Sequence, residues 1–170
     1  MKKILVIALA LVLCLSIVAC SKEGGEGKKD DVKGETQTWG QITVFVPEGY
    51  ELSGGSITGS DSDDETQCSI QPTTFNMYDY WWIAIKDAED AAASIESTKE
   101  FNNGEDVTVT AGDNTWTGCK YVYESSFNGS IDCGSISSEI NGVTYLVTFC
   151  GHAPESAEMI AVLESLAAAE

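Results

Sequence analysis

Hydrophobic and polar residues alternate from residue 131 to residue 150, and this pattern predicts a long β-hairpin. Asn141-Gly142 stands between the two halves and favours a two-residue type I′ turn, because both central positions of that turn need positive φ. In this register Cys133 lies opposite Cys150, and the two residues form a pair without mutual hydrogen bonds. The Cα atoms of such a pair are about 4.5 Å apart, which is a distance that a disulfide can span. The register also places six apolar residues on one face: Ile136, Ile140, Val143, Tyr145, Val147 and Phe149.

Shorter hydrophobic runs predict four strands before this hairpin, at residues 38–46, 51–59, 68–71 and 77–86. The last of these runs, MYDYWWIAIK, is apolar on both of its faces. A strand of this kind is expected in the centre of a sheet that is covered on both sides.

Another hairpin and two helices complete the pattern. Strands are predicted at residues 107–110 and 115–125, and a turn at Asn128-Gly129 then places Cys119 opposite Ser138. A helix is expected over residues 87–103, and a second one over residues 155–168. Strands and helices in this order predict an α+β fold, in which helices pack on a mostly antiparallel sheet.

Several segments resemble the PsbP-like family of small α+β domains, which includes many bacterial lipoproteins. They are an opening strand that ends in Val46-Pro47-Glu48-Gly49-Tyr50, the helix after the fourth strand, the hairpin over residues 142–149, and a closing helix that ends in Leu163-Glu164-Ser165-Leu166. The resemblance covers roughly residues 41–166. It implies a non-enzymatic accessory or binding role and supplies no site residues, and the four cysteines of this domain are additional to the family pattern.

The N-terminal residues 1–19 have the pattern of a signal peptide, with two lysines followed by an apolar run that is short for a membrane span. The run ends in Ile17-Val18-Ala19-Cys20, which resembles the lipobox of bacterial lipoproteins. That resemblance implies cleavage before Cys20 and attachment of lipid to its sulfur. An ordinary signal peptide with an unrelated cysteine, or an uncleaved anchor, are the alternatives.

Composition divides the remaining chain into a tether and one domain. Residues 20–37 hold the lipidated cysteine and a stretch rich in glycine, lysine and acids that is predicted to be flexible. Residues 38–170 are expected to form a single α+β domain. We therefore expect a protein that a lipid anchor holds at the cell membrane, facing away from the cytoplasm.

The predicted domain is strongly acidic, since it carries 22 aspartates and glutamates against three lysines and no arginine. This charge of −19 disfavours nucleic acid and anionic membrane surfaces as partners. It favours solubility and, as a sharper hypothesis, attraction of cations or basic partners.

Four cysteines remain in the domain, and four cysteines allow three pairings. The register of the long hairpin favours Cys133–Cys150, which leaves Cys68 and Cys119 as a second predicted disulfide. Zinc binding and free thiols are the alternatives, but the cysteines lack CxxC spacing and export favours oxidation.

An acidic loop is the one candidate metal site. Its carboxylates are the ligands that calcium prefers, although Thr66 and Pro72 stand where an EF-hand needs glycine and glutamate. A solvated acidic loop is the alternative, and no other cofactor is expected. The candidate ligands are Asp61, Asp63, Asp64 and Glu65.

Catalytic motifs are absent from the sequence. His152 is the single histidine, and we interpret it as a loop residue after a strand. No nucleophile elbow occurs, and a pair of carboxylates suited to glycoside chemistry cannot be singled out among so many acids.

Dense aromatic residues in the 77–86 run are the candidate ligand-binding surface. Tyr78, Tyr80 and Trp82 share one face and would be exposed if that face were open, although filling of the core is the alternative. The sequence thus predicts a cell-surface lipoprotein with a non-catalytic domain that binds an unknown protein or glycan. A calcium-responsive domain and a carboxylate-dependent secreted hydrolase are the alternative functions.

Overall fold

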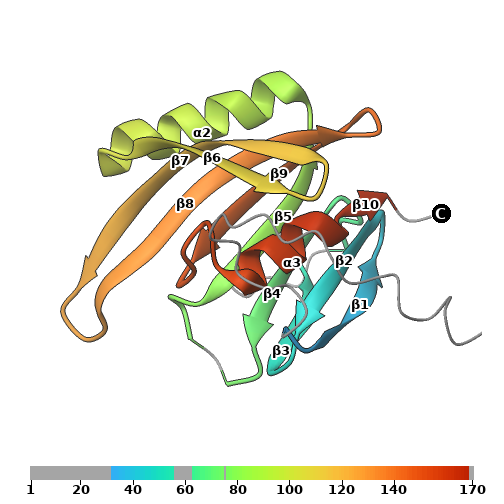
Figure 1. The fold of residues 1–170 in the computed structure, drawn as a ribbon, viewed down its shortest axis with the longest axis horizontal. Helices are drawn as coiled ribbons and strands as arrows, with labels where there is room; N and C mark the ends of the chain where they lie inside the picture. The colour runs from blue at the N-terminus through green and yellow to red at the C-terminus, as the bar shows by residue number, and fades with distance from the viewer. Residues whose placement is uncertain (1–31, 56–62, 75, 169–170) are drawn as a thin grey trace, which may run out of the picture.

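Residues 32–55, 63–74 and 76–168 are described by the computed structural model (Figure 1). The predicted signal peptide, the lipobox with Cys20 and the loop residue Asp61 lie outside these residues. Neither helix of the described part is long and apolar enough to cross a bilayer.

The described residues form two antiparallel sheets. The larger one has seven strands in the order β3-β4-β5-β9-β8-β7-β6, and the smaller one has the order β1-β2-β10. The larger sheet comprises β3 (Tyr50–Gly54), β4 (Gln67–Pro72), β5 (Tyr80–Lys86), β6 (Glu105–Ala111), β7 (Asn114–Ser125), β8 (Gly129–Ile140) and β9 (Val143–Cys150). The smaller sheet comprises β1 (Gly34–Trp39), β2 (Ile42–Pro47) and β10 (Ala167–Ala168).

One helix lies on each side of the larger sheet (Figure 1). Helix α2 (Ala88–Asn102) contacts β7, β8 and β9 on one face, whereas α3 (Ala157–Ser165) contacts β2 and β6 on the other. The hydroxyl of Ser156 accepts a hydrogen bond from the Met159 amide and caps α3. This arrangement confirms the predicted α+β fold with helices on an antiparallel sheet.

The main core lies between the larger sheet and the layer that α3 and β2 form. Alternate residues of the central strands point into this core, so that Trp81, Ile83, Tyr145 and Phe149 are fully buried. Strand β5 has neighbours on both sides in the sheet, as its two apolar faces predicted.

The register of the long hairpin is as predicted. Ile140 pairs with Val143 around the turn, and Cys133 pairs with Cys150. Both turn residues have positive φ, 53° at Asn141 and 82° at Gly142. The two cysteines are joined by a disulfide with Cα atoms 4.1 Å apart.

The predicted N-terminal boundary of the domain is wrong by several residues. The segment predicted as one strand over residues 38–46 is a hairpin, and its first strand, β1, begins at Gly34 inside the predicted tether over residues 20–37. The hydrophobic pattern does not predict β1, because β1 is an edge strand whose residues are mostly polar and exposed. The turn uses Gly40, whose φ is 51°.

The second predicted turn is also wrong, by three positions in register. Ser125 pairs with Gly129, so the loop between β7 and β8 has three residues and Cys119 lies opposite Ser135 instead of Ser138. The Ser125 hydroxyl accepts hydrogen bonds from the amides of Phe127 and Asn128. Gly129 has a φ of 74°, so it supplies the left-handed residue that directly follows this loop, a conformation that glycine adopts without steric cost.

The closing helix is shorter than the predicted 155–168 range. It ends at Ser165, and Ala167 and Ala168 instead pair with Thr43 and Ile42 of β2. This short strand ties the C-terminal part of the described chain to the smaller sheet.

Candidate functional site

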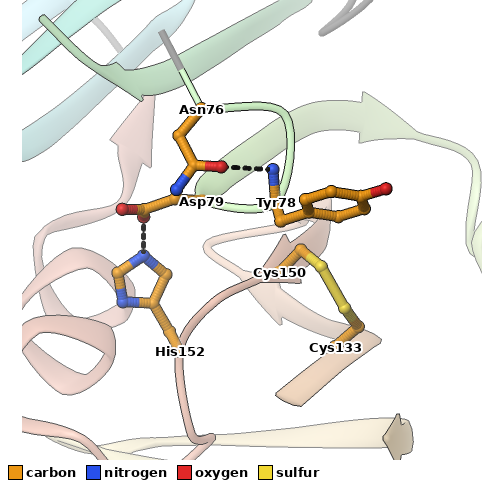
Figure 2. The surroundings of a disulfide bond; sticks show 6 residues. All are labelled: Asn76, Tyr78, Asp79, Cys133, Cys150 and His152. Atoms are coloured by element: carbon orange, nitrogen blue, oxygen red, sulfur yellow. Dashed lines mark hydrogen bonds and ion pairs between the residues drawn. A yellow bond between two sulfur atoms is a disulfide. The ribbon is translucent and has the colours of Figure 1, made fainter. Parts of the chain in front are cut away.

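The disulfide between Cys133 and Cys150 joins the end of β9 to β8, and the segment that precedes β5 lies beside it (Figure 2). Directly after Cys150, the Gly151 amide donates a hydrogen bond of 2.8 Å to the Asp132 carbonyl. Gly151 has a φ of 87°, and a Cβ atom there would lie 2.7 Å from the Tyr78 carbonyl oxygen. Only glycine therefore fits this position without strain.

Beyond Gly151, a polar cluster forms around Asp79. Its Oδ1 lies 2.8 Å from Nε2 of His152, and the Tyr50 hydroxyl donates to both carboxylate oxygens at 3.0 and 3.2 Å. The His152 ring stacks on Trp81 with centroids 3.7 Å apart. His152 is only 9% exposed, so it is a buried and hydrogen-bonded residue and not the simple loop residue that the sequence suggested.

Burial dominates the electrostatics of this cluster. It lowers the pKa of His152 below 6.5, although the neighbouring Asp79 acts in the opposite direction. Burial, followed by the hydrogen bond to Asp79, raises the pKa of the Tyr50 hydroxyl. The neutral histidine and the neutral tyrosine both donate to the carboxylate, which fixes the position of the Asp79 side chain.

Four tyrosines gather around the disulfide on the sheet face that carries α2. One row of paired residues crosses four neighbouring strands at this point. It consists of Tyr80 on β5, Cys150 on β9, Cys133 on β8 and Tyr121 on β7. Tyr78 stacks on Tyr123 beside this row, with centroids 5.4 Å apart and an angle of 22° between the rings. We call this surface the tyrosine face, and its members are Tyr78, Tyr80, Tyr121 and Tyr123.

Helix α2 leaves the tyrosine face open. In the middle of the helix, the Ile95 carbonyl accepts a hydrogen bond from the thiol of Cys119, which stands one row before Tyr121 on the same face of β7. The β7–β8 hairpin then continues past the helix and past the end of β9 (Figure 1). Consequently Tyr123 is 41% exposed, and Phe127 in the hairpin loop is 94% exposed.

A groove of about 270 Å³ lies where β9 stops, and we call it the end groove. Among the residues that the structure describes, its lining contains two aspartates and no basic side chain. One wall is Asn76, Tyr78 and Asp79, and the other is Asn128, Ser130, Ile131 and Asp132, with Gly151 between them.

A second groove, of about 580 Å³, lies on the other side of Gly151. Tyr50 and His152 line it together with charged residues of both signs, namely Lys33, Glu48 and Glu158. The polar cluster around Asp79 therefore separates two surface depressions.

The predicted aromatic residues are only partly at this site. Tyr78 and Tyr80 are half-buried members of the tyrosine face. Trp82 pairs with Thr148 one row nearer to α2, and it is half-buried as well. Tyr121 and Tyr123 were not among the predicted site residues. The register predicted for β7 and β8 differs by three residues from the observed one, and it therefore places the β7 side chains on the opposite face of the sheet.

The second predicted disulfide is contradicted, since Cys68 and Cys119 are both free and buried. The pairing across the sheet explains this. Cys68 pairs with Ile83 on the core face, whereas Cys119 pairs with Ser135 on the face that carries α2. Thiols on opposite faces of a sheet, with three strands between them, cannot be joined.

The acidic loop is described only in part. Asp63, Asp64 and Glu65 are exposed, and Asp61 lies outside the described residues. The Asp64 carboxylate accepts hydrogen bonds from the Thr66 amide and hydroxyl and from the Gln67 side chain, and the bonds from Thr66 lower its pKa. Within the described ranges, no three acidic, histidine or cysteine side chains gather as metal ligands would.

Comparison with known proteins gives similarity of structure only. No family model and no curated protein matches the sequence. A crystal structure from Bacteroides thetaiotaomicron is similar over 81% of this chain, with a TM-score of 0.53 and 12% identity, and this chain spans about half (49%) of that protein. The solution structure of a cyanobacterial PsbP (CyanoP) from Synechocystis is similar over 90% of this chain and 99% of its own length, with a TM-score of 0.44 and 7% identity.

Proposed function

We propose that this protein is a cell-surface lipoprotein whose domain binds a partner without catalysing a reaction, through the tyrosine face and the adjoining end groove. The observation that carries this proposal is the gathering of four tyrosines on a part of the sheet that α2 leaves open. Tyrosine offers a large contact area at a low cost in side-chain entropy, and it is enriched in binding surfaces for that reason.

The surroundings of the tyrosine face support a binding role. The disulfide and the stacking of Tyr78 on Tyr123 hold the rings in place before any partner arrives, and such preorganisation lowers the entropic cost of association. Phe127 adds an exposed apolar ring in the same hairpin. Apolar anchors beside a polar groove are the usual composition of an interface.

Anchoring through Cys20 rests on the lipobox pattern of residues 17–20. The test is metabolic labelling with an alkyne-bearing palmitate, followed by fractionation of the bacterial host. We expect label and membrane association in the parent protein and neither in the Cys20→Ala variant. Equal membrane association of the two proteins would contradict lipid anchoring.

Binding is tested by affinity capture from envelope extracts with the full-length protein in a neutral detergent. We expect a partner that the parent retains and that the Tyr78→Ala/Tyr123→Ala variant loses. The Phe101→Ala variant is the matched control, because it removes an exposed ring on α2, outside the tyrosine face. Capture that is the same for all three proteins would exclude the tyrosine face as the binding surface.

A further inference from the structure

The end groove exposes a stretch of unpaired strand in the interior of the sheet. Strand β8 begins at Gly129, but its pairing with β9 starts only at Cys133. Residues 129–132 are therefore paired as a ladder with β7 on one side alone, apart from the single bond between the Gly151 amide and the Asp132 carbonyl. The end groove occupies the place that a longer β9 would fill.

The alternation of an antiparallel ladder shows which backbone groups point into this groove. The bond from Gly151 to Asp132 directs the amides and carbonyls of even-numbered residues in this part of β8 toward the β9 side. The amide and the carbonyl of Ser130 accordingly point into the end groove. Ser130 lines that groove, and its hydroxyl donates to Glu124.

This position differs from an ordinary edge of a sheet. Outer edges invite uncontrolled pairing between proteins, whereas here the opposite wall, Asn76 to Asp79, limits the space. The Asn76 side chain accepts a hydrogen bond from the Tyr78 amide, and the Asp79 amide bonds to the Asn76 carbonyl, which gives that wall a defined shape (Figure 2). The free side of β8 therefore faces a groove that is bounded on its opposite side.

Charge selects the composition of that strand. Asp79 and Asp132 stand on either side of Gly151, and the described lining of the groove has no basic residue. In the predicted domain only three lysines oppose 22 acids, and Lys99 and Lys120 are paired with Asp106 and Glu105. A lysine or arginine in the incoming segment would meet carboxylates, and its approach would be accelerated by the field of the whole domain.

We propose that the end groove binds an extended, basic peptide segment of a partner protein, which adds to the free side of β8 at Ser130 as a continuation of β9. This inference deepens the proposed binding function and rests on it. Recognition by strand addition takes affinity from main-chain hydrogen bonds and specificity from side chains. Here the side chains on one face of the added strand would lie against the tyrosine face.

The test uses the full-length protein in a neutral detergent and a fluorescent peptide of alternating lysine and valine, with binding followed by anisotropy. The same peptide with N-methylated backbone amides should bind at least about fivefold more weakly, because the loss of one hydrogen bond costs about 1 kcal/mol. A peptide with glutamate in place of lysine should not bind. Hydrogen exchange should show slower exchange of the Ser130 amide in the complex.

Matched variants locate the site. Asp132→Asn should weaken binding about twofold to fivefold, as expected for one exposed ion pair. Asp113→Asn removes the same charge in the turn at the other end of β7 and should leave binding unchanged. Equal effects of the two variants, equal affinity of the N-methylated peptide, or an unaltered Ser130 amide would each overturn strand addition at this groove.

The outcome also separates this inference from the proposed function. Capture of a partner that depends on the tyrosine face, without binding of the basic peptide, would refute only the inference. Failure of both experiments would refute the two together.

Discussion

His152 shows how the surroundings of one residue decide its charge. Asp79 lies within hydrogen-bonding distance, Tyr50 and Trp81 contact the ring, and Glu158 contributes a further negative charge. These acids favour the protonated ring, but burial opposes it and prevails. The cluster is therefore a support that positions Asp79 at the wall of the end groove, and it works with a neutral histidine.

We expect the pKa of His152 in the folded protein to lie below 6.5, as measured by NMR titration of its ring protons. The unfolded chain then binds more protons just below pH 6.5, so folding stability is lost as the pH falls from 6.5 through the folded pKa. The His152→Gln variant should lose this part of the pH dependence. A folded pKa above 6.5 would show that Asp79 outweighs burial.

Cys68 and Cys119 should remain thiols that do not react in the folded protein. Both are buried, and burial raises the pKa of Cys68 to about 12, so that almost no thiolate is present near neutral pH. Mass spectrometry after treatment with iodoacetamide should find both alkylated only when the alkylation is done in denaturant. A peptide that links Cys68 to Cys119 would contradict the arrangement of the sheet.

At the scale of the elements, the connection from β9 to α3 depends on one glycine. Gly151 and Gly49 both have positive φ, but only a Cβ atom at Gly151 would collide with backbone. We expect Gly49→Ala to destabilise the fold by about 1–2 kcal/mol through backbone conformation alone. Gly151→Ala should lower the free energy of unfolding, measured with denaturant, by clearly more than this. Equal losses in the two variants would mean that the Tyr78 backbone moves away from the new Cβ atom without cost.

The elements that the sequence predicts well are those with a local signal. Asn141-Gly142 allows one turn geometry, so the register of the long hairpin and the Cys133–Cys150 disulfide follow from it. Asn128-Gly129 looks the same in sequence, but Ser125 caps a three-residue loop there and shifts the register. A shift by an odd number of residues moves side chains to the other face of the sheet, so Tyr121 and Tyr123 could not be predicted as members of the tyrosine face. The partners of Asp79 could not be predicted either, because they come from segments that are distant in the sequence.

At the scale of the whole molecule, charge and shape act together. The predicted domain has a net charge of −19, so its acidic side chains repel one another and attract cations. The β7–β8 hairpin projects from the molecule (Figure 1), and it carries Tyr121, Tyr123 and the stretch of β8 that β9 does not pair with. Both features favour the binding of a basic partner, as proposed above.

We expect salt to stabilise this domain by screening, and calcium to act no differently from sodium at equal ionic strength. The reason is that Thr66 and Gln67 already donate hydrogen bonds to the carboxylate of Asp64 in the acidic loop. Thermal unfolding of the full-length protein in matched sodium and calcium solutions measures this. A rise of several degrees in calcium alone would support the calcium-responsive alternative.

The most direct test of the account is cross-linking in living host cells from the tyrosine face. A photoreactive benzoylphenylalanine at position 123 reports on contacts at that surface, and the same group at Asp113, at the other end of β7, is the control. We expect a discrete adduct with one partner from position 123 and none from position 113. Adducts that are absent from position 123, or the same from both positions, would contradict it.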